Sequence, residues 1–456
     1  MAKSKSVFVC TNCGSESPKW IGKCYSCGEW NSFVEEIAIT GKSKSSRTIS
    51  FSPLEVQKPV SVNNVVADTV PRIDTGIDEL NRVLGGGMVP GALVLVGGEP
   101  GIGKSTLVLQ MALKLSEVDI LYVSGEESQQ QIKMRAERIA PDKGDHCLVV
   151  NETSLEKVVT HVNNCKPSLL IIDSVQTLER EGIESAPGSV SQIRECTAAI
   201  MRIAKEKNLP VILIGHINKE GSIAGPKVLE HIVDVVLQFE GDRQHMYRIL
   251  RSAKNRFGST SEIGIFEMLG TGLREVLNPS EMFLAHQQRD MSGIAISAAV
   301  EGQRPFLIEV QALAGTAAYG TPQRSSTGFD LRRLNMLLAV LEKRAGFKLA
   351  AKDVFLNIAG GLKVNDPAID LAVVTAILSS NTDLTVDRHT ALTGEVGLSG
   401  EIRPVTRIEQ RVGEAQKLGF KKIIIPRYNK GVDFSKYSIE IFQADKIEEA
   451  FRDLFA

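Results

Sequence analysis

The feature that most constrains this chain is an apolar run that breaks into a glycine-rich turn and continues as an apolar-periodic helix. It covers residues 92–106 and reads ALVLVGGEPGIGKST. Gly98 and Gly103 bracket four residues, so the turn can curl until successive backbone N–H groups face inward on phosphates, assisted by the dipole of the helix that begins near Lys104. A glycine-rich turn that binds nothing is the alternative, but strand, turn and helix are all present in order. The sequence therefore predicts an α/β ATPase core built around a phosphate-binding loop.

Residues of this loop have distinct parts in holding ATP. Lys104 is expected to reach the β- and γ-phosphates, and the Ser105 hydroxyl to ligate Mg²⁺. A later apolar run, residues 169–172, ends in Asp173, the expected water-mediated partner of that Mg²⁺. The predicted nucleotide-binding set is Gly98, Glu99, Pro100, Gly101, Ile102, Gly103, Lys104, Ser105, Thr106 and Asp173.

Two carboxylates follow another apolar run, residues 120–124. Open α/β sheets bind ligands at the carboxyl ends of their strands, so Glu126 and Glu127 are expected beside the γ-phosphate. No glutamate follows Asp173, so the base that orients the attacking water must come from elsewhere. Glu126 is the first candidate and Glu127 the second, and the alternative is that both are helix N-terminal charges favoured by the dipole.

Length and charge limit the possible classes of protein. A chain of 456 residues fits about three domains, and 43% hydrophobic residues is ample for their cores. With 53 basic against 54 acidic residues, any DNA contact must come from local patches or loops. The N-terminus lacks the apolar core of a signal peptide, and no uncharged apolar run approaches the ~20 residues that span a bilayer. We expect a cytoplasmic protein with no membrane partner.

Four of the seven cysteines fall within the first 27 residues, as two Cys-x-x-Cys pairs that are each followed by glycine. Four thiolates in this spacing favour tetrahedral Zn²⁺, which would fold a segment of ~30 residues that is too short to hold a core alone. A redox role is the alternative, but neither pair sits in a βαβ context. Trp20 and Trp30 are expected either to contact DNA or protein, or to pack on the module. The predicted zinc ligands are Cys10, Cys13, Cys24 and Cys27.

A short helix and a glycine turn, at residues 75–80 and 84–91, are predicted before the first central strand. This lead-in and the loop after it are similar to the RecA-like ATPases, which include hexameric replicative helicases and circadian-clock ATPases. The resemblance implies that His216, which follows the apolar run 211–215, senses the γ-phosphate, although a lone histidine is usually structural. It also implies that loops 179–190 and 218–230 line a channel and contact DNA, with solvated surface as the alternative.

The string Lys-Asn-Arg-Phe-Gly at residues 254–258 makes the resemblance more specific. Together with the four-cysteine ribbon, it resembles the bacterial RadA (Sms) family of DNA recombination and repair proteins, and the match covers nearly the whole chain. In RecA-like assemblies, basic residues at this place cross the subunit interface and neutralise charge on the neighbour's nucleotide. The resemblance therefore implies catalytic roles for Lys254 and Arg256 and a homo-oligomeric ring, with a hexamer favoured.

Two glycine-bounded segments, residues 361–372 and 394–405, resemble the α+β proteolytic domain of Lon. A Lon protease needs a serine nucleophile and a lysine base. The serine's place falls at Ile369 or Asp370 and the lysine's at Glu409, so we expect a non-proteolytic domain kept for assembly or DNA contact. Seven basic residues form either a phosphate-tracking patch or a solvated helix face: Arg324, Arg332, Arg333, Lys343, Arg344, Lys348 and Lys352.

We therefore predict a zinc ribbon at residues 1–35, a linker at 36–66, a RecA-like ATPase domain at 67–280 and a Lon-protease-like domain at 281–456. The expected function is that of a helicase-type, DNA-dependent ATPase. It would bind single-stranded and branched DNA and promote branch migration or strand-exchange extension in recombination and repair, with a recombinase as a candidate partner. The alternative is a nucleotide-switched scaffold that regulates recombination without translocating.

Overall fold

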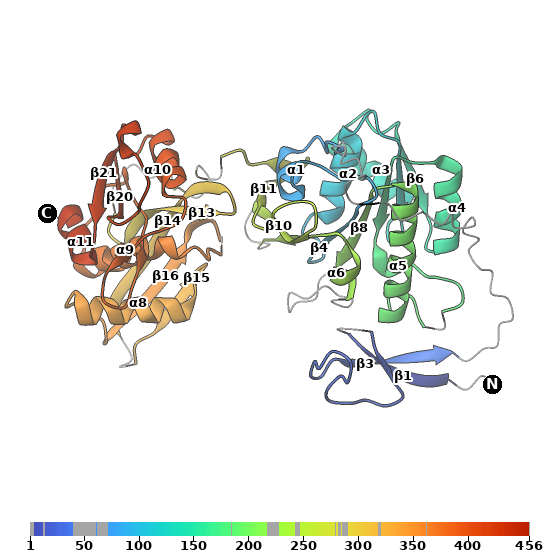
Figure 1. Ribbon diagram of the computed structural model, residues 1–456, viewed down its shortest axis with the longest axis horizontal. Coiled ribbons are helices and arrows are strands. Elements are labelled where there is room, and N and C mark those ends of the chain that lie inside the picture. The colour runs from blue at the N-terminus through green and yellow to red at the C-terminus, as the bar shows by residue number, and fades with distance from the viewer. Residues whose placement is uncertain are drawn as a thin grey trace. The chain divides into compact units, whose positions relative to one another are not determined.

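The computed structural model describes most of the chain and divides it into two compact units, residues 1–275 and 276–456 (Figure 1). The border follows residue 275, whereas the sequence places it after residue 280. The described residues are 4–11, 14–39, 61, 72–183, 185–216, 228–241, 247–278, 280, 284, 291–317, 321–361 and 363–455.

The N-terminal segment of unit 1 forms a three-stranded antiparallel sheet in the order β2–β1–β3. Its strands are β1 (Ser4–Cys10), β2 (Glu16–Ser17) and β3 (Phe33–Ile39). Because β3 pairs along the whole of β1, with Ile39 opposite Ser4, residues 36–39 belong to the ribbon and not to the predicted linker. Residues 40–60 and 62–66 of that linker lie outside the described residues.

The centre of unit 1 is a nine-stranded sheet in the order β12–β11–β10–β9–β4–β8–β7–β5–β6, in which β4 to β9 run parallel. β4, β5 and β7 are buried along their whole length, as expected for parallel strands covered on both faces. The parallel strands are β4 (Leu93–Gly98), β5 (Ile120–Ser124), β6 (Cys147–Asn151), β7 (Leu169–Asp173), β8 (Val211–His216) and β9 (Val235–Glu240). The antiparallel strands are β10 (Tyr247–Asn255), β11 (Ile263–Leu269) and β12 (Gly272–Glu275).

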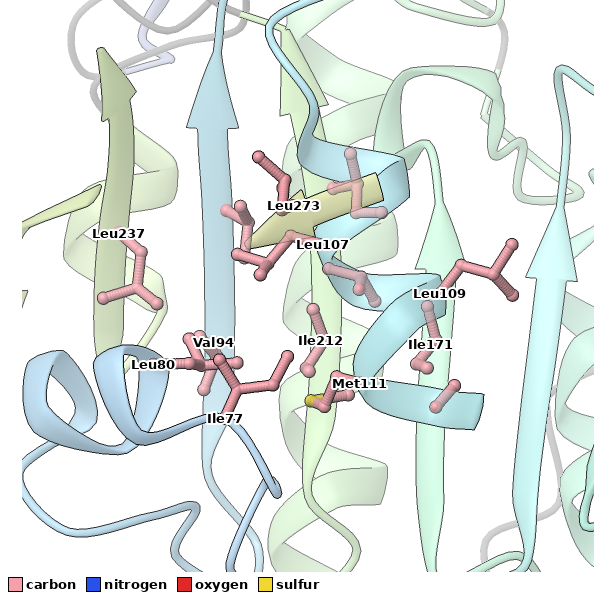
Figure 2. Close-up of a cluster of buried hydrophobic side chains, with 14 of the residues drawn as sticks. Ile77, Leu80, Val94, Leu107, Leu109, Met111, Ile171, Ile212, Leu237 and Leu273 are labelled. Atoms are coloured by element: carbon pink, nitrogen blue, oxygen red, sulfur yellow. The ribbon is translucent and has the colours of Figure 1, made fainter. Parts of the chain in front are cut away.

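Helices cover both faces of this sheet. Successive residues of a strand point to opposite faces, so Val94 joins the core on the side of α1, α2 and α3, shown in Figure 2, and Leu95 joins the core beneath α4, α5 and α6. The helices are α1 (Asp78–Leu84), α2 (Lys104–Lys114), α3 (Gln129–Ile139), α4 (Leu155–Cys165), α5 (Val190–Lys207) and α6 (Val228–Ile232), with a 3₁₀ turn at Val175–Thr177.

Two edges of the sheet matter for the site. β4 and β8 are in register with Gly98 beside His216, and β5 and β7 with Ser124 beside Asp173, so these strand ends share the carboxyl edge. β10 runs antiparallel to β9 and therefore finishes at the opposite, amino edge. β10 continues to Asn255, with a bulge between Ser252 and Lys254.

Unit 2 is an α+β domain on a mixed seven-stranded sheet in the order β15–β16–β14–β13–β17–β20–β21. Helix α9 is buried along most of its length and lies against β13 and β14. The strands are β13 (Ile294–Glu301), β14 (Arg304–Thr316), β15 (Arg324–Thr327), β16 (Lys352–Ile358), β17 (Thr390–Leu392), β20 (Lys422–Pro426) and β21 (Glu440–Ala444), with the small pair β18 (Glu395–Val396) and β19 (Ile402–Arg403). The helices are α8 (Leu331–Arg344), α9 (Asp370–Thr382), α10 (Ile408–Lys417) and α11 (Ile447–Phe455), with 3₁₀ turns at Ala359–Gly361, Pro367–Ile369 and Phe434–Lys436.

Candidate functional site

The glycine-rich loop connects the end of β4 to the start of α2, as predicted. Gly103 has a φ of 116°, a left-handed conformation that side chains rarely adopt. At Gly98 a Cβ would lie 2.9 Å from the Cβ of Phe239, so a side chain there would collide with β9. The loop thus needs glycine at Gly103 for its backbone conformation and at Gly98 for want of space, and α2 begins at Lys104 with its amino end toward the loop.

The Lys104 side chain is buried and turned into this loop. Its Nζ donates to the carbonyl oxygens of Gly98 at 2.8 Å and Glu99 at 2.9 Å. Burial lowers the pKa of Lys104 to about 8, although the carboxylates of Asp173 and Glu126 act in the other direction. Because the Lys104 ammonium group is largely shielded from water, an anionic ligand such as a phosphate would stabilise its charged form.

His216 links Lys104 to Glu126 across the carboxyl edge. The Lys104 Nζ lies 3.3 Å from His216 Nδ1, and His216 Nε2 lies 3.1 Å from Glu126 Oε1. When His216 Nδ1 accepts a hydrogen bond from the Lys104 ammonium, the imidazole proton is on Nε2. Nε2 then donates a hydrogen bond to Glu126. The Ser174 hydroxyl also donates to Glu126. The hydrogen bond from His216 is the main cause that lowers the pKa of Glu126 to about 2, so this carboxylate is ionised at neutral pH.

Asp173 lies at the end of β7, next to the loop helix. Burial raises its pKa, while hydrogen bonds from Tyr122 and Ser105 act in the opposite direction. The Ser105 hydroxyl and the Asp173 carboxylate are hard oxygen ligands of the kind that Mg²⁺ prefers, and they are in hydrogen-bond contact. The residues present therefore fit the Mg²⁺ ion that accompanies ATP.

Glu127 has a different environment from Glu126. Its side chain pairs with Arg135 of α3, and its backbone N–H donates to the Ser124 hydroxyl at 3.1 Å. The predicted roles of the two carboxylates thus separate: Glu126 lies among Lys104, His216 and Ser174, whereas Glu127 holds an arginine.

Lys254 and Arg256 lie at the amino edge of the sheet. Lys254 is level with Val236 of β9, which is level with Leu95 of β4. Gly98 lies three positions beyond Leu95, about 10 Å further along the strand. The Lys254 Nζ donates to the carbonyl oxygens of Glu230 at 2.6 Å and Val233 at 2.8 Å, at the end of α6.

Arg256 is the freer of the two cations. Its side chain is 57% exposed, and its guanidinium lies 3.8 Å from the Asp234 carboxylate. That carboxylate is already bound by Lys205 at 2.7 Å and by the Leu93 N–H at 3.1 Å. Lys254 and Arg256, the two residues predicted to reach a neighbour's nucleotide and called the finger residues below, therefore lie away from the phosphate-binding loop of their own chain.

The ribbon brings cysteine sulfurs together. Those of Cys10, Cys24 and Cys27 all lie within 4.8 Å of one another, and Cys10 and Cys27 are 3.7 Å apart. A tetrahedral zinc with Zn–S bonds of about 2.3 Å separates its ligand sulfurs by about 3.8 Å, so the donor set fits zinc. Gly14 and Gly28, at φ 71° and 76°, donate their N–H groups to the carbonyls of Cys10 and Cys24 and close both turns. The fourth predicted ligand, Cys13, lies outside the described residues.

Comparisons with known proteins agree with this arrangement. Residues 60–222 match a family model described as an AAA domain, residues 8–35 a rubredoxin metal binding domain, and residues 323–429 subunit ChlI of Mg-chelatase. The chain is 50% identical to the DNA repair protein RadA of Bacillus subtilis over 454 residues, covering 99% of each chain. It is also 50% identical to the DNA repair protein RadA of Halalkalibacterium halodurans over 452 residues, 99% of this chain and 98% of that one. The chain belongs to the RadA family of DNA repair proteins.

Among solved structures, a KaiC-like protein from Pyrococcus horikoshii covers 45% of this chain and 99% of its own, with 22% identity and a TM-score of 0.38. The family models and the RadA relatives confirm the predicted family and the predicted fold class, an α/β ATPase core with an N-terminal ribbon and a C-terminal α+β domain. Every helix in the described part of this RadA-family chain is too short or too polar to traverse a bilayer.

In unit 2 the positions expected for the Lon dyad carry other contacts. Ile369 is fully buried, and Asp370 is held by Arg333 through two hydrogen bonds and by the Val396 N–H at 3.1 Å. Glu409 lies in the exposed first turn of α10. The pairing with Asp370 also removes Arg333 from the predicted basic patch, because its guanidinium faces a carboxylate of its own domain.

Three contacts of the candidate site escape a motif search: the Tyr122 hydroxyl on Asp173, the Ser174 hydroxyl on Glu126, and Arg135 on Glu127. One signal for the first was available, since Tyr122 is the aromatic residue of a buried strand whose other members are aliphatic residues and Ser124. Of the predicted DNA loops, residues 218–227 lie outside the described residues, while Glu179 is tied to Thr153 and Leu155 by backbone hydrogen bonds.

Proposed function

We propose that this chain hydrolyses ATP with Mg²⁺ at the carboxyl edge of its nine-stranded sheet. A ring of subunits would use this hydrolysis to move along single-stranded and branched DNA during recombination and repair. The observation that carries the proposal is the division of the ATPase groups between two opposite edges of one sheet. Lys104, Asp173, Glu126 and His216 lie at one edge, and the two basic residues of the Lys-Asn-Arg-Phe-Gly string lie at the other.

For hydrolysis, Lys104 would hold the β- and γ-phosphates, and Ser105 with Asp173 would hold Mg²⁺. When Lys104 turns to the phosphates it gives up its bond to His216 Nδ1. His216 is then free to rotate away from Glu126. Because the bond from His216 is the main cause of the low pKa of Glu126, losing it makes Glu126 a stronger base for the attacking water.

Charge neutralisation in the transition state would come from a second subunit. Arg256 is 57% exposed and at the wrong edge for its own nucleotide, so it can serve only a neighbour's site. Lys254 would act in part indirectly. Its Nζ holds the end of α6 and so ties β10 to this helix, which follows the expected DNA loop in the sequence.

The experiment is ATP hydrolysis with and without single-stranded DNA, beside ATP-dependent unwinding of a labelled branched DNA. We expect DNA to stimulate ATP hydrolysis and Lys104→Ala to abolish the hydrolysis. Arg256→Ala should retain nucleotide affinity and lose the stimulation by DNA. Lys254→Ala should also retain nucleotide binding and lose the stimulation. The exposed Arg452→Ala is the matched control.

Normal DNA-stimulated turnover in Arg256→Ala and Lys254→Ala would contradict the finger assignment. DNA-stimulated hydrolysis without any unwinding or branch migration would instead favour the alternative, a nucleotide-switched scaffold that regulates recombination partners. Cleavage of casein by the purified chain would contradict the non-proteolytic assignment of unit 2.

A further inference from the structure

A buried tyrosine hydroxyl points at the proposed magnesium site. Tyr122, on β5, is 1% exposed and lies in the core beneath α2. Phenylalanine would fill the same volume there, and a buried hydroxyl needs a hydrogen-bond partner to offset its lost hydration. Its partner is the Asp173 carboxylate, with the hydroxyl donating to Oδ2 at 2.7 Å.

The sheet register explains why this residue reaches that carboxylate. Tyr122 is level with Ile171 on the neighbouring parallel strand, and Asp173 lies two residues further on. Residues two apart on a strand share a face, so both side chains point toward α2. The offset of about 6.6 Å along the strand matches the length of an extended tyrosine side chain.

The Asp173 carboxylate is thereby held from two sides. Tyr122 donates from the sheet, and the Ser105 hydroxyl donates from α2. Ser105 is the residue expected to ligate Mg²⁺, so its hydroxyl would leave Asp173 when the ion is bound. The hydrogen bond from Tyr122 would then be the one that fixes the rotamer of the Asp173 carboxylate.

We propose that Tyr122 is a positioning residue for the magnesium site, acting through Asp173. The inference rests on the proposed ATPase function. Outer-shell groups of this kind typically change metal affinity by roughly 10–100-fold when they are removed. Tyr122→Phe deletes the hydroxyl and keeps the ring, so it separates positioning from packing.

The test uses Mn²⁺ as a paramagnetic substitute for Mg²⁺. Its affinity for the full-length protein with a slowly hydrolysed ATP analogue is measured by electron paramagnetic resonance, and analogue affinity is measured separately in EDTA. In Tyr122→Phe we expect Mn²⁺ to bind roughly 10-fold more weakly, with analogue affinity in EDTA unchanged. Tyr437→Phe, which removes another hydroxyl bonded to a carbonyl at 3.2 Å, is the matched control and should leave both values unchanged.

A double-mutant cycle distinguishes loss of the hydrogen bond to Asp173 from loss of packing around Tyr122. In an Asp173→Asn background, Tyr122→Phe should change Mn²⁺ affinity no further, whereas a packing defect would weaken it in both backgrounds. Unchanged Mn²⁺ affinity in Tyr122→Phe, or equal losses in both backgrounds, would overturn the proposal. Failure of the proposed function looks different, because the parent protein itself would then show no nucleotide-dependent Mn²⁺ binding.

Discussion

The proton on Lys104 gives a sharp test of the nucleotide site. Burial brings the pKa of Lys104 down to about 8, from the ordinary lysine value of 10.5. Phosphate charges beside the ammonium favour its protonated form, so nucleotide binding should raise this pKa again. The complex then holds more protons than the free protein above pH 7, and binding takes up protons from the solvent.

The size of the effect follows from the pKa. With a free-protein value of about 8 and a complex value above about 10, uptake is about 0.1 proton at pH 7, about 0.5 at pH 8 and about 0.9 at pH 9. A complex that gains protons becomes weaker as pH rises, so affinity for an ATP analogue should fall about 10-fold between pH 7 and pH 9. Glu126, with a pKa of about 2, does not titrate in this range.

Isothermal titration calorimetry in buffers of different ionisation enthalpy measures the uptake directly. Lys104→Arg is the matched control, because a guanidinium remains protonated throughout and its binding should be independent of pH over this range. A flat affinity and zero uptake for the parent protein would refute the reasoning. So would an equal pH dependence in the arginine variant, since the proton would then belong to another group.

Three further predictions concern the two carboxylates, the zinc ribbon and the Asp370–Arg333 pair. Glu126→Gln should bind ATP normally and lose roughly 100-fold or more in turnover, whereas Glu127→Gln, at an arginine-paired position, should lose much less; equal losses in steady-state kinetics would contradict the assignment. Zinc removal by a chelator should change the intrinsic tryptophan emission, since the only two tryptophans lie in the ribbon, while nucleotide binding persists; unchanged emission would speak against a structural zinc. Asp370→Asn should lower the free energy of unfolding by about 3 kcal/mol in urea followed by circular dichroism, because it leaves Arg333 without its buried partner. Glu137→Gln, which breaks an exposed pair with Lys133, should cost less than about 1 kcal/mol.

The phosphate-binding loop and the parallel strands could be predicted from sequence because their signals are local. The apolar runs 120–124, 169–172 and 211–215 reproduce the ends of β5, β7 and β8 within one residue, because burial of a strand is visible in the sequence as a run of apolar residues. The cysteine spacing likewise identifies the ribbon without reference to the rest of the chain.

Sequence reasoning placed Glu126 before Glu127 as the candidate base, but it did not predict what surrounds each carboxylate, because those side chains come from three other elements. Ser174 and His216 approach Glu126 from the ends of β7 and β8, and Arg135 approaches Glu127 from α3. Adjacent residues at a strand end point in different directions, and only the packed neighbours decide which one faces the phosphates. The same reason applies to Arg333, which by composition looked like part of a basic patch and is instead paired with Asp370.

The two-edge arrangement limits how copies of this chain can assemble if Arg256 serves a neighbour's nucleotide. A two-fold dimer joins one surface patch to its own copy, so both the loop and the finger would have to lie in that patch. They lie at opposite edges of the sheet, with Lys104 at the carboxyl edge and Arg256 beyond the end of β10 at the amino edge. A head-to-tail contact satisfies the requirement, because it repeats the pairing of finger and loop at every interface. Such contacts close into rings or extend as filaments, so a cyclic assembly, as proposed for the motor, is the closed form in which every nucleotide site is complete.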